Sequence, residues 1–429
     1  MDFLREQLDK VAHHFEKGGK YEALYPFFEA NDTILYTPGT VTKAASHVRD
    51  MLDQKRMMIT VVLALLPICL FACWNTGYQA SLAIGKGAAP HEGWQTALWL
   101  MFGGGFDAHN LIACTLYGAL FFLPVWLVTG IVGGHIEVAF SIIRKHEITE
   151  GFLVTWFLFA LTLPPTIPLW MVAVGIAFGV VLGKEVFGGV GMNVMNPALV
   201  SRAFLFFAYP AAMSGDAVWV AATNTDTFTG ATWLSTAADA TKGMAALEAE
   251  PNLWMNSFIG MIPGSMGETS ALLCFVGALV LIATKIGSWR TMAGVVIGTA
   301  GTVFLLNAVG SDTNPMFAMP FHWHIVLGGW AFGMVFMATD PVSSSFTDTG
   351  KWFYGAGIGL FVTLVRVVNP GYPEGMMLAI LFMNMFAPLI DHFVVQANVK
   401  RRVARYASTG GGAAKPAHEA KPAAEKGAT

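Results

Sequence analysis

The polar side chains with the most distinctive spacing lie in a loop between about residues 214 and 256. The loop contains the run Asp-Thr-Phe-Thr-Gly-Ala-Thr at residues 226–232. A carboxylate followed by hydroxyl side chains and a glycine is common in ordinary turns, and an unmodified threonine hydroxyl is a poor nucleophile. A Ser–His–Asp site is excluded in this loop because the loop contains no histidine.

The spacing of the same run favours a more specific interpretation. It fits the pattern D-x-x-[ST]-G-A-T, at which a flavin transferase attaches FMN through a phosphoester bond to the final threonine. The final threonine is Thr232, and the other fixed positions are Asp226, Thr229, Gly230 and Ala231. We therefore predict covalent FMN at Thr232.

Carboxylates within apolar sequence form the second group that could do chemistry. A charge at membrane depth is costly, so it indicates a functional residue by default. Glu137 and Asp391 are interpreted as ligands or relay groups for a hard cation, which prefers oxygen ligands. Glu268 and Asp340 lie where apolar runs begin or end. For these two, capping of a helix end is the alternative interpretation.

These residues must be held by membrane-spanning helices, because the composition excludes a soluble fold. Only 12% of the 429 residues are charged, about half the share in a soluble globular protein. Of the 53 charged side chains, 17 lie in residues 1–56 and nine in residues 400–429, which leaves 27 for residues 57–399. A soluble enzyme, a nucleic-acid-binding protein and a disordered scaffold are therefore excluded. No metal cofactor is expected, because the four cysteines lack the spacing of a zinc or iron–sulfur site.

Ten apolar runs approach the length of about 20 residues that a bilayer-spanning helix needs. They lie at residues 57–75, 109–133, 151–163, 167–183, 197–213, 269–287, 291–310, 321–339, 352–368 and 374–396. Pro164, Pro165 and Pro168 separate the third run from the fourth, which predicts a tight hairpin of two helices. The ninth run contains Arg366.

Loop charges predict the topology of these runs. If the N-terminus is cytoplasmic, lysine and arginine gather on the side of both termini, as expected for cytoplasmic loops, and the outer loops carry mostly carboxylates. We predict an all-α polytopic membrane protein with about ten transmembrane helices, both termini cytoplasmic and the flavin-bearing loop 214–256 periplasmic. Two halves of five helices would be inverted relative to one another, a common plan in transporters.

The ends of the chain are expected to differ from the membrane domain at residues 57–399. Residues 1–56 contain several aromatic side chains and are predicted to form an ordered cytoplasmic segment. Residues 400–429 are basic at first and then rich in alanine, proline and lysine, which predicts a cytoplasmic tail that becomes disordered.

Further motifs connect the chain to a known family. They are Gly18-Gly19-Lys20, Leu35-Tyr36-Thr37-Pro38-Gly39, Ser46-His47-Val48-Arg49-Asp50, the run GGVGMNVMNPA at 188–198, Gly267-Glu268-Thr269-Ser270 and Ala338-Thr339-Asp340-Pro341-Val342-Ser343-Ser344. With these motifs, the chain resembles the family that comprises the NqrB subunit of the bacterial sodium-translocating NADH:quinone reductase and the RnfD subunit of the Rnf ferredoxin:NAD oxidoreductase. The resemblance covers nearly all of residues 1–400. The 56-residue lead favours the quinone reductase, because the RnfD subunit begins close to its first membrane helix.

The resemblance implies an electron carrier in a six-subunit complex of the bacterial inner membrane. Such a subunit passes electrons through flavins toward ubiquinone, and this transfer is coupled to outward movement of Na⁺. Thr232 would bear the FMN, attached by a flavin transferase that recognises Asp226 and Thr229. Glu137, Asp391, Glu268 and Asp340 are then candidates for the Na⁺ pathway.

The resemblance also suggests where two further molecules bind. The family carries a noncovalent riboflavin, for which Asn193 and Asn196 in a glycine-rich break are candidates, and a plain Asx turn is the alternative. Gly133 and Gly134 match a glycine pair associated with quinone binding, and a simple helix end is the alternative there.

Two other functions remain open at this stage. An RnfD-type subunit of an ion-pumping ferredoxin:NAD oxidoreductase would share the flavin motif. A flavin-free polytopic solute transporter would equally have ten spans and buried carboxylates. It would leave the D-x-x-T-G-A-T loop unexplained.

Overall fold

The computed structural model describes residues 2–16, 18–36, 54–145, 148, 151–223, 230–239, 241, 243–369 and 374–408. Six helices within these residues are long and apolar enough to cross a membrane. They are α3 (Gln54–Gly85), α5 (Leu111–Arg144), α7 (Leu169–Gly183) with the adjoining 3-10 turn η2 (Glu185–Phe187), α14 (Trp289–Val309), α17 (Asp348–Val368) and α18 (Met376–Ser408). Three shorter apolar helices accompany them: α6 (Gly151–Leu161), α8 (Pro197–Ala208) and α13 (Ala271–Ala283). The prediction of a helical polytopic membrane protein is confirmed.

Short elements cover both ends of the helix bundle. Those near the N-terminus are α1 (Asp2–Ala12), the 3-10 turn η1 (Glu22–Leu24) and α2 (Tyr25–Leu35). The others are α4 (Trp94–Met101), α9 (Pro210–Met213), α10 (Trp233–Ala238), α11 (Gly243–Ala249), α12 (Leu253–Ile259) and the 3-10 turn η3 (Pro315–Ala318). Strands β1 (Ala89–Pro90) and β2 (Ala222–Thr223) pair antiparallel, with Ala89 opposite Thr223.

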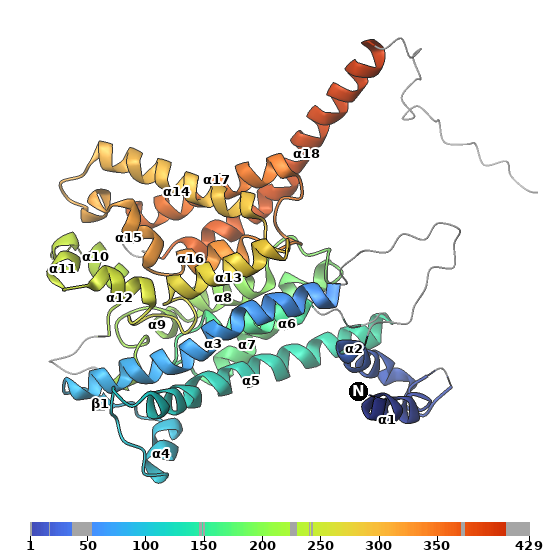
Figure 1. Ribbon diagram of the computed structural model, residues 1–429, viewed down its shortest axis with the longest axis horizontal. Helices are drawn as coiled ribbons and strands as arrows, with labels where there is room; N and C mark the ends of the chain where they lie inside the picture. Colours follow the sequence, from blue (N-terminus) through green and yellow to red (C-terminus); the bar gives the residue numbers. More distant parts are fainter. Residues whose placement is uncertain are drawn as a thin grey trace, which may run out of the picture.

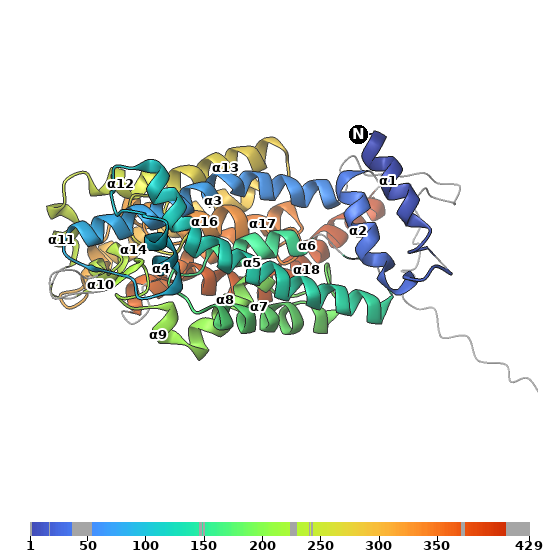
Figure 2. The ribbon, with the colours of Figure 1, turned by 90° about the horizontal axis from the view of Figure 1, so that it is seen from below.

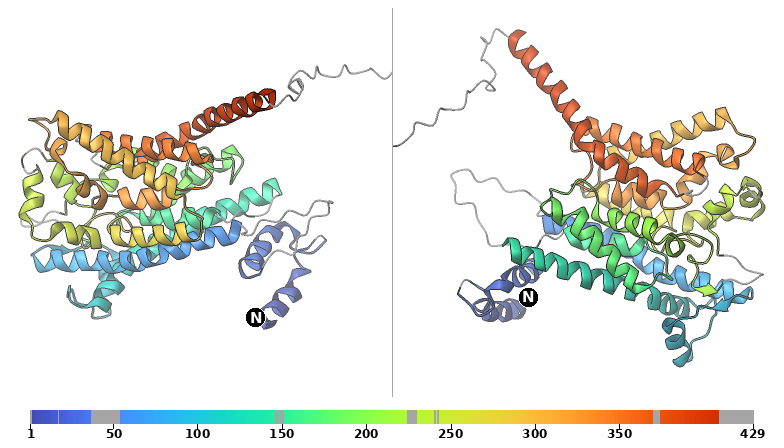
Figure 3. Two further views of the ribbon diagram at one scale, coloured as in Figure 1. Left: turned by 45° about the horizontal axis from the view of Figure 1, so that its top comes forward. Right: turned by 180° about the vertical axis from the view of Figure 1, so that it is seen from behind.

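The long helices run roughly parallel to the long axis of the molecule (Figure 1). Helix α3 packs along α5, α14 packs along α17, and α17 packs against α18. Helices α1 and α2 lie at one end of the bundle, whereas α10 and α11 lie at the opposite end (Figure 2). The last turns of α18 extend toward the same end as α1 (Figure 3). Termini on the same side of a membrane require this arrangement.

Close packing of α14 on α17 depends on glycine. A Cβ atom added to Gly294 would lie 2.9 Å from the carbonyl oxygen of Trp352, and one added at Gly355 or Gly359 would overlap the backbone of α14. Small residues spaced four apart therefore let the two helix backbones touch, as in other membrane helices. The glycine faces serve helix packing here.

One predicted span is divided by a break, and another forms a shorter helix than predicted. The run 321–339 is divided into α15 (Phe321–Val326), α16 (Trp330–Phe332) and the π-helix η4 (Gly333–Met337). The break falls at Gly328, whose φ of +65° favours glycine. The run 151–163 forms a helix only as far as Leu161. Helix α6 then packs on α3, α5 and α8, and it does not pack closely along α7 as the predicted tight hairpin would.

Several predicted helix ends also differ from the structure. Helix α5 continues through Gly133 as far as Arg144, and α18 continues through residue 400 to Ser408. The segment 400–408 is therefore helical, and the disorder predicted for residues 409–429 falls outside the described residues. Helix α8 ends at Ala208 because Pro210 cannot continue its hydrogen-bond ladder. Glu268 does not open α13, since the N-cap of that helix is Ser270.

Candidate functional site

A cavity of about 320 Å³ lies beside α10, at the end of the bundle opposite α1 and α2 (Figure 2). Its wall includes Thr232, the side chains of Trp219 and Trp233, and a group of charged residues. The volume is at the lower end of the range of about 300–1,000 Å³ typical of small-molecule sites. Thr232 and Glu268, two candidates chosen separately from the sequence, thus border one space.

Thr232 is positioned by the start of α10. It is the N-cap of this helix, and its Oγ1 accepts a hydrogen bond from the backbone nitrogen of Ser235 at 3.3 Å. The preceding Gly230 is buried, and a Cβ atom there would lie 2.6 Å from the carbonyl oxygen of Asp216. A side chain at position 230 would therefore push the turn away from its neighbour. Asp226 and Thr229 lie outside the described residues.

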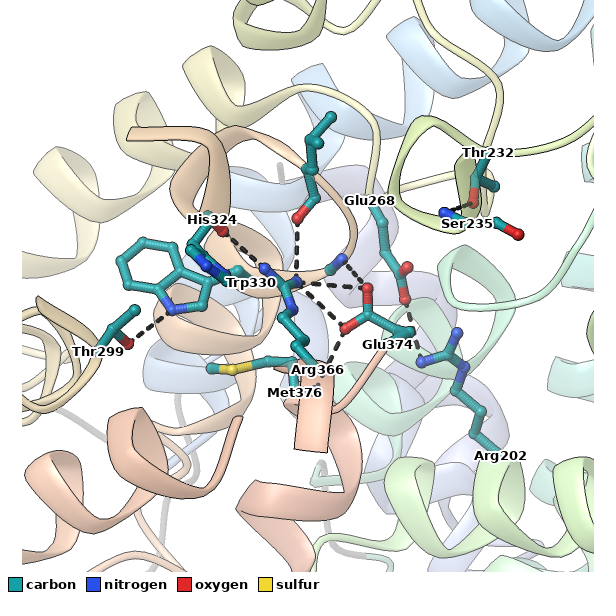
Figure 4. A network of polar contacts seen from close by, with 12 residues as sticks. Arg202, Thr232, Ser235, Glu268, Thr299, His324, Trp330, Arg366, Glu374 and Met376 are labelled. Atoms are coloured by element: carbon teal, nitrogen blue, oxygen red, sulfur yellow. Dashed lines mark hydrogen bonds and ion pairs between the residues drawn. The ribbon is translucent and has the colours of Figure 1, made fainter. Parts of the chain in front are cut away.

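Four charged side chains form a network at the inner wall of this cavity (Figure 4). An Nη atom of Arg202, on α8, lies 3.3 Å from a carboxylate oxygen of Glu268. An Nη atom of Arg366, on α17, lies 3.5 Å from Glu374. Arg202, Glu268 and Glu374 border the cavity. Two positive and two negative groups share the region, so each buried charge has a counter-charge nearby.

The break in the run 321–339 is held by this network. Arg366 donates hydrogen bonds to the carbonyl oxygens of His324, at 2.8 Å, and Leu327, at 3.0 Å. Glu374 accepts hydrogen bonds from the backbone nitrogens of Gly329, at 2.8 Å, and Met376, at 3.2 Å. Interrupted backbone at membrane depth is tolerated where protein groups satisfy it. The Arg366–Glu374 pair supplies those groups.

The loop that carries Glu268 supplies hydrogen-bond partners for the backbone carbonyls at the end of α6 and just beyond it. The backbone nitrogen of Gly267 donates to the carbonyl oxygen of Leu161 at 2.7 Å, and that of Met266 donates to Leu163 at 3.2 Å. Asn75, buried in α3, donates to the carbonyl oxygen of Ile262 at 3.1 Å. Ile262 and Glu268 of this loop, and Gly328 of the other break, border the cavity beside Thr232.

The residues around this cavity fit a flavin attached to Thr232. Thr232 lies on the cavity wall, Trp219 and Trp233 supply aromatic side chains there, and Arg202 supplies planar donors for ring carbonyls. The cavity thus matches a flavin in the chemistry of its side chains and in its volume of about 320 Å³.

A second, smaller cavity lies near the opposite end, among α6, α8 and η4. Asn193, Asn196 and Asp340 border it together with Lys184, and its volume is about 60 Å³. Asn196 caps α8, since its Oδ1 accepts from the backbone nitrogen of Ala198 at 3.0 Å. Its amide nitrogen lies 3.4 Å from a carboxylate oxygen of Asp340. The structure therefore brings the two candidate asparagines together with one candidate carboxylate.

The size of this second cavity does not fit a flavin ring. A volume of about 60 Å³ holds a few water molecules, whereas ring cofactors occupy pockets of about 300 Å³ or more. The Asx-turn alternative describes the contacts of Asn196 directly. A riboflavin here requires the cavity to open.

Glu137 lies inside α5 and is buried. Its carboxylate forms an ion pair with the ammonium group of Lys184, whose side chain is 3% exposed. Glu185 extends this cluster, because one of its carboxylate oxygens lies 3.0 Å from an Nη atom of Arg144. Glu137 already has a cationic partner, so binding of Na⁺ there requires Lys184 to move or lose its charge.

The two candidate glycines of the quinone site lie within α5 rather than at its end. Gly133 is buried, and a Cβ atom there would overlap the ring of Phe152 and lie 3.1 Å from Ile176. Gly134 is only half-buried. Close packing against α6 and α7 therefore requires a glycine at position 133.

Asp391 interacts mainly with the loop that precedes α17. Its carboxylate accepts hydrogen bonds from the hydroxyls of Ser345, at 2.7 Å, and Thr347, at 2.6 Å, and from two backbone nitrogens. The two backbone nitrogens cannot serve as ligands of a cation, which needs oxygen acceptors, whereas the two hydroxyl oxygens keep lone pairs. The contacts favour an anchoring role for Asp391 in this conformation.

Sequence reasoning missed Arg202, Lys184 and Glu374 as members of buried networks. The signal was present for Arg202, which lies inside the apolar run 197–213, since a charge at that depth indicates function by default. Lys184 and Glu374 lie at the ends of apolar runs, where a surface position is the simpler interpretation. Their burial became evident only from the fold. Among the described residues, no group of three or more His, Cys, Asp or Glu side chains is arranged to hold a metal ion.

Comparisons with known proteins show the family to which the chain belongs. The model of the NQR2, RnfD, RnfE family matches residues 41–400. The NqrB subunit of the Na(+)-translocating NADH-quinone reductase of Pseudomonas paraeruginosa is 60% identical over 405 residues, which are 94% of this chain and 99% of that protein. The proteins of the same name from Stutzerimonas stutzeri and Chromohalobacter salexigens are 58% and 56% identical over 94% of this chain, and the matches cover 99% and 97% of their own lengths.

Proposed function

Because this chain belongs to the NQR2, RnfD, RnfE family, we propose that it acts as the NqrB subunit of a Na⁺-translocating NADH-quinone reductase and carries FMN in phosphoester linkage to Thr232. One observation carries the flavin assignment. Thr232, selected from a sequence motif alone, lies on the wall of the cavity that Arg202, Glu268 and two tryptophans also border.

The residues of the cavity would have separate tasks. The covalent tether at Thr232 prevents loss of the flavin on the outer side of the membrane, where no free flavin pool exists. Trp219 and Trp233 limit access of water to the ring, and the charged inner wall sets the electrostatic environment. The flavin itself supplies the electron-transfer chemistry, and the protein supplies orientation and electrostatics.

The rest of the electron pathway depends on partners. We propose that other subunits of the six-subunit complex deliver electrons from NADH, that a flavin transferase attaches the FMN, and that electrons continue toward ubiquinone. Riboflavin near Asn193 and Asn196, and quinone near Gly133 and Gly134, remain proposals. Glu137, Glu268, Asp340 and Asp391 remain candidates for the Na⁺ pathway, and the hydrogen-bond donors around Asp391 make it the weakest of the four.

We also propose ten crossings of the bacterial inner membrane in two inverted halves. The packing of helices supports two halves of similar design. Helix α5 packs on α7 as α14 packs on α17, and α7 packs on α8 as α17 packs on α18. The second half contains a helix interrupted at Gly328, and in the first half α6 ends at Leu161 after 11 residues. Interrupted helices at the interface of inverted repeats form the binding sites of many transporters.

The comparisons favour the quinone reductase over an RnfD-type subunit. The relatives at 56–60% identity bear the name of the former. A flavin-free transporter remains separable by experiment, because it predicts no flavin at Thr232.

The flavin assignment is tested by denaturing gel electrophoresis of the purified complex under ultraviolet light. The wild-type chain is expected to fluoresce, and Thr232→Val is expected to remove the fluorescence because it removes the attachment oxygen. Thr236→Val is the matched control, since Thr236 lies on the same helix and its hydroxyl donates to the carbonyl oxygen of Thr232 at 3.2 Å, not to the attachment oxygen. A dark wild-type band, or a fluorescent Thr232→Val band, contradicts the assignment.

A further inference from the structure

Among the described residues, the cavity beside Thr232 has one cationic side chain on its wall. Arg202 extends from α8, is 6% exposed, and borders the cavity together with Thr232 (Figure 4). The other arginine of the network, Arg366, does not border the cavity. Its guanidinium is directed to the carbonyl oxygens of His324 and Leu327, at 2.8 and 3.0 Å, in the interrupted helix. The two buried arginines therefore have different surroundings.

Arg202 is held in place by the loop before α13. Its Nη atom lies 3.3 Å from Glu268, whose own side chain is 6% exposed. The backbone around Glu268 is fixed in turn, because Gly267 donates to the carbonyl oxygen of Leu161 at 2.7 Å. A Cβ atom at Gly267 would lie 2.6 Å from the side chain of Leu161, so this loop is packed tightly. A buried arginine with such a partner keeps its charge and its position.

We propose that Arg202 is the positioning residue that meets the flavin ring inside the cavity and raises its reduction potential, and that Glu268 fixes Arg202 for this task. This inference rests on the proposed attachment of FMN to Thr232. Reduction adds electron density to the ring, and a nearby guanidinium stabilises that density and donates to ring carbonyls in a planar geometry. Arg202 itself exchanges neither electrons nor protons. The electrons arrive from the partner carrier and leave toward quinone as in the proposed function.

The location of the pair strengthens this inference. Arg202 and Glu268 are each 6% exposed, and both border the cavity together with Gly328 at the break in the run 321–339. Electrostatic interactions are stronger there than at the surface. A cation on this wall therefore has a larger effect on a bound ring than a surface lysine at the same distance.

The test is a redox titration of the purified complex, followed by optical absorption. The flavin couple that Thr232→Val removes identifies the ring in question. Arg202→Gln is expected to retain the fluorescent band on a denaturing gel and to lower the midpoint potential of that couple. We expect at least a tenfold change in the equilibrium constant for two-electron reduction, which corresponds to about 30 mV. Arg202→Lys, which keeps the charge, is expected to recover most of the potential.

Two further variants make the test decisive. Arg144→Gln is the matched control, because Arg144 also pairs with a buried glutamate, Glu185, at 3.0 Å, but near the opposite end of the bundle. It is expected to leave the couple unchanged. If Arg202→Gln fails to assemble, the charge-balanced double variant Arg202→Gln with Glu268→Gln takes its place. A smaller fall in the same direction is expected, because loss of the Glu268 carboxylate offsets part of the lost positive charge.

Each outcome either supports or overturns the role of Arg202. The role of Arg202 is overturned if the midpoint potential is unchanged in Arg202→Gln, or in the double variant where that is used, while the fluorescent band is retained. The attachment at Thr232 then still stands. An equal shift in Arg144→Gln also overturns the role of Arg202, since the effect would then be general. Absence of a fluorescent wild-type band overturns the proposed function itself.

Discussion

Several charged side chains inside this membrane domain lie in pairs of opposite charge. Lys184 pairs with Glu137, Arg202 with Glu268, and Arg366 with Glu374. A lone charge in such surroundings would cost several kcal/mol, and a partner offsets most of that cost. From sequence, four of the carboxylates could be identified as unusual because so few charges lie in apolar runs. Their partners could not be identified, because pairing depends on helices far apart in the chain.

The Lys184–Glu137 pair gives a prediction about stability and ion coupling. Glu137→Ala removes one carboxylate partner of the buried ammonium of Lys184, which keeps Glu185 at 3.8 Å. We therefore expect a loss of about 3 kcal/mol in the free energy of unfolding, the lower end for breaking a buried pair. Adding Lys184→Met is expected to restore most of that loss, because both charges are then removed. Thermal unfolding of the purified complex measures both effects.

The double variant then separates stability from coupling. If Glu137 belongs to the Na⁺ pathway, stimulation of quinone reduction by Na⁺ falls in the double variant even though the complex is stable. Stimulation equal to the wild type in a stable double variant would remove Glu137 from the pathway.

At the scale of elements, the interruptions explain where sequence reasoning succeeded and where it failed. Uninterrupted apolar runs predicted α14 and α17 to within a few residues, because length and composition decide such helices. The break at Gly328 was not predicted, whereas α6 ends at Leu161, two residues before the end predicted from the prolines that follow. The free backbone groups at these two places are satisfied by Gly267 and by the Arg366–Glu374 pair, which come from other parts of the chain. No local pattern carries that information.

The interrupted helix α15–α16 is expected to depend on Arg366. Arg366→Met would leave Glu374 without its cation and two carbonyl oxygens without their donor. We expect a loss of about 3–5 kcal/mol, the usual result of breaking a buried pair. Arg290→Met is the control, because the Arg290–Asp348 pair is exposed, with side chains 36% and 67% accessible, and an exposed pair contributes only about 0–1 kcal/mol. Equal thermal stability of the two variants would contradict a structural role for the buried pair.

At the scale of the whole molecule, Thr232 and the Arg202–Glu268 pair are brought to one end by the topology. The prediction from loop charges places the loop of Thr232 and the chain termini on opposite sides, and the structure has α10 and α1 at opposite ends of the bundle (Figure 3). The contents of the cavity could not have been predicted, because its wall combines α8, the loop before α13 and the residue Glu374 just before α18. What the sequence does provide is a prediction of the side of the membrane on which each loop lies.

The orientation is testable at one crossing. Helix α14 has 21 residues, which span about 30 Å at 1.5 Å per residue, the thickness of a hydrocarbon core. Its flanking residues Lys285 and Asp312 are both exposed. We expect Asp312→Cys to react with a membrane-impermeant maleimide in intact spheroplasts, and Lys285→Cys to react only after permeabilisation. The four native cysteines are buried, so background labelling is expected to be low. Labelling of Lys285→Cys in intact spheroplasts would show that the basic loop faces outward and would reverse the topology, placing Thr232 on the cytoplasmic side.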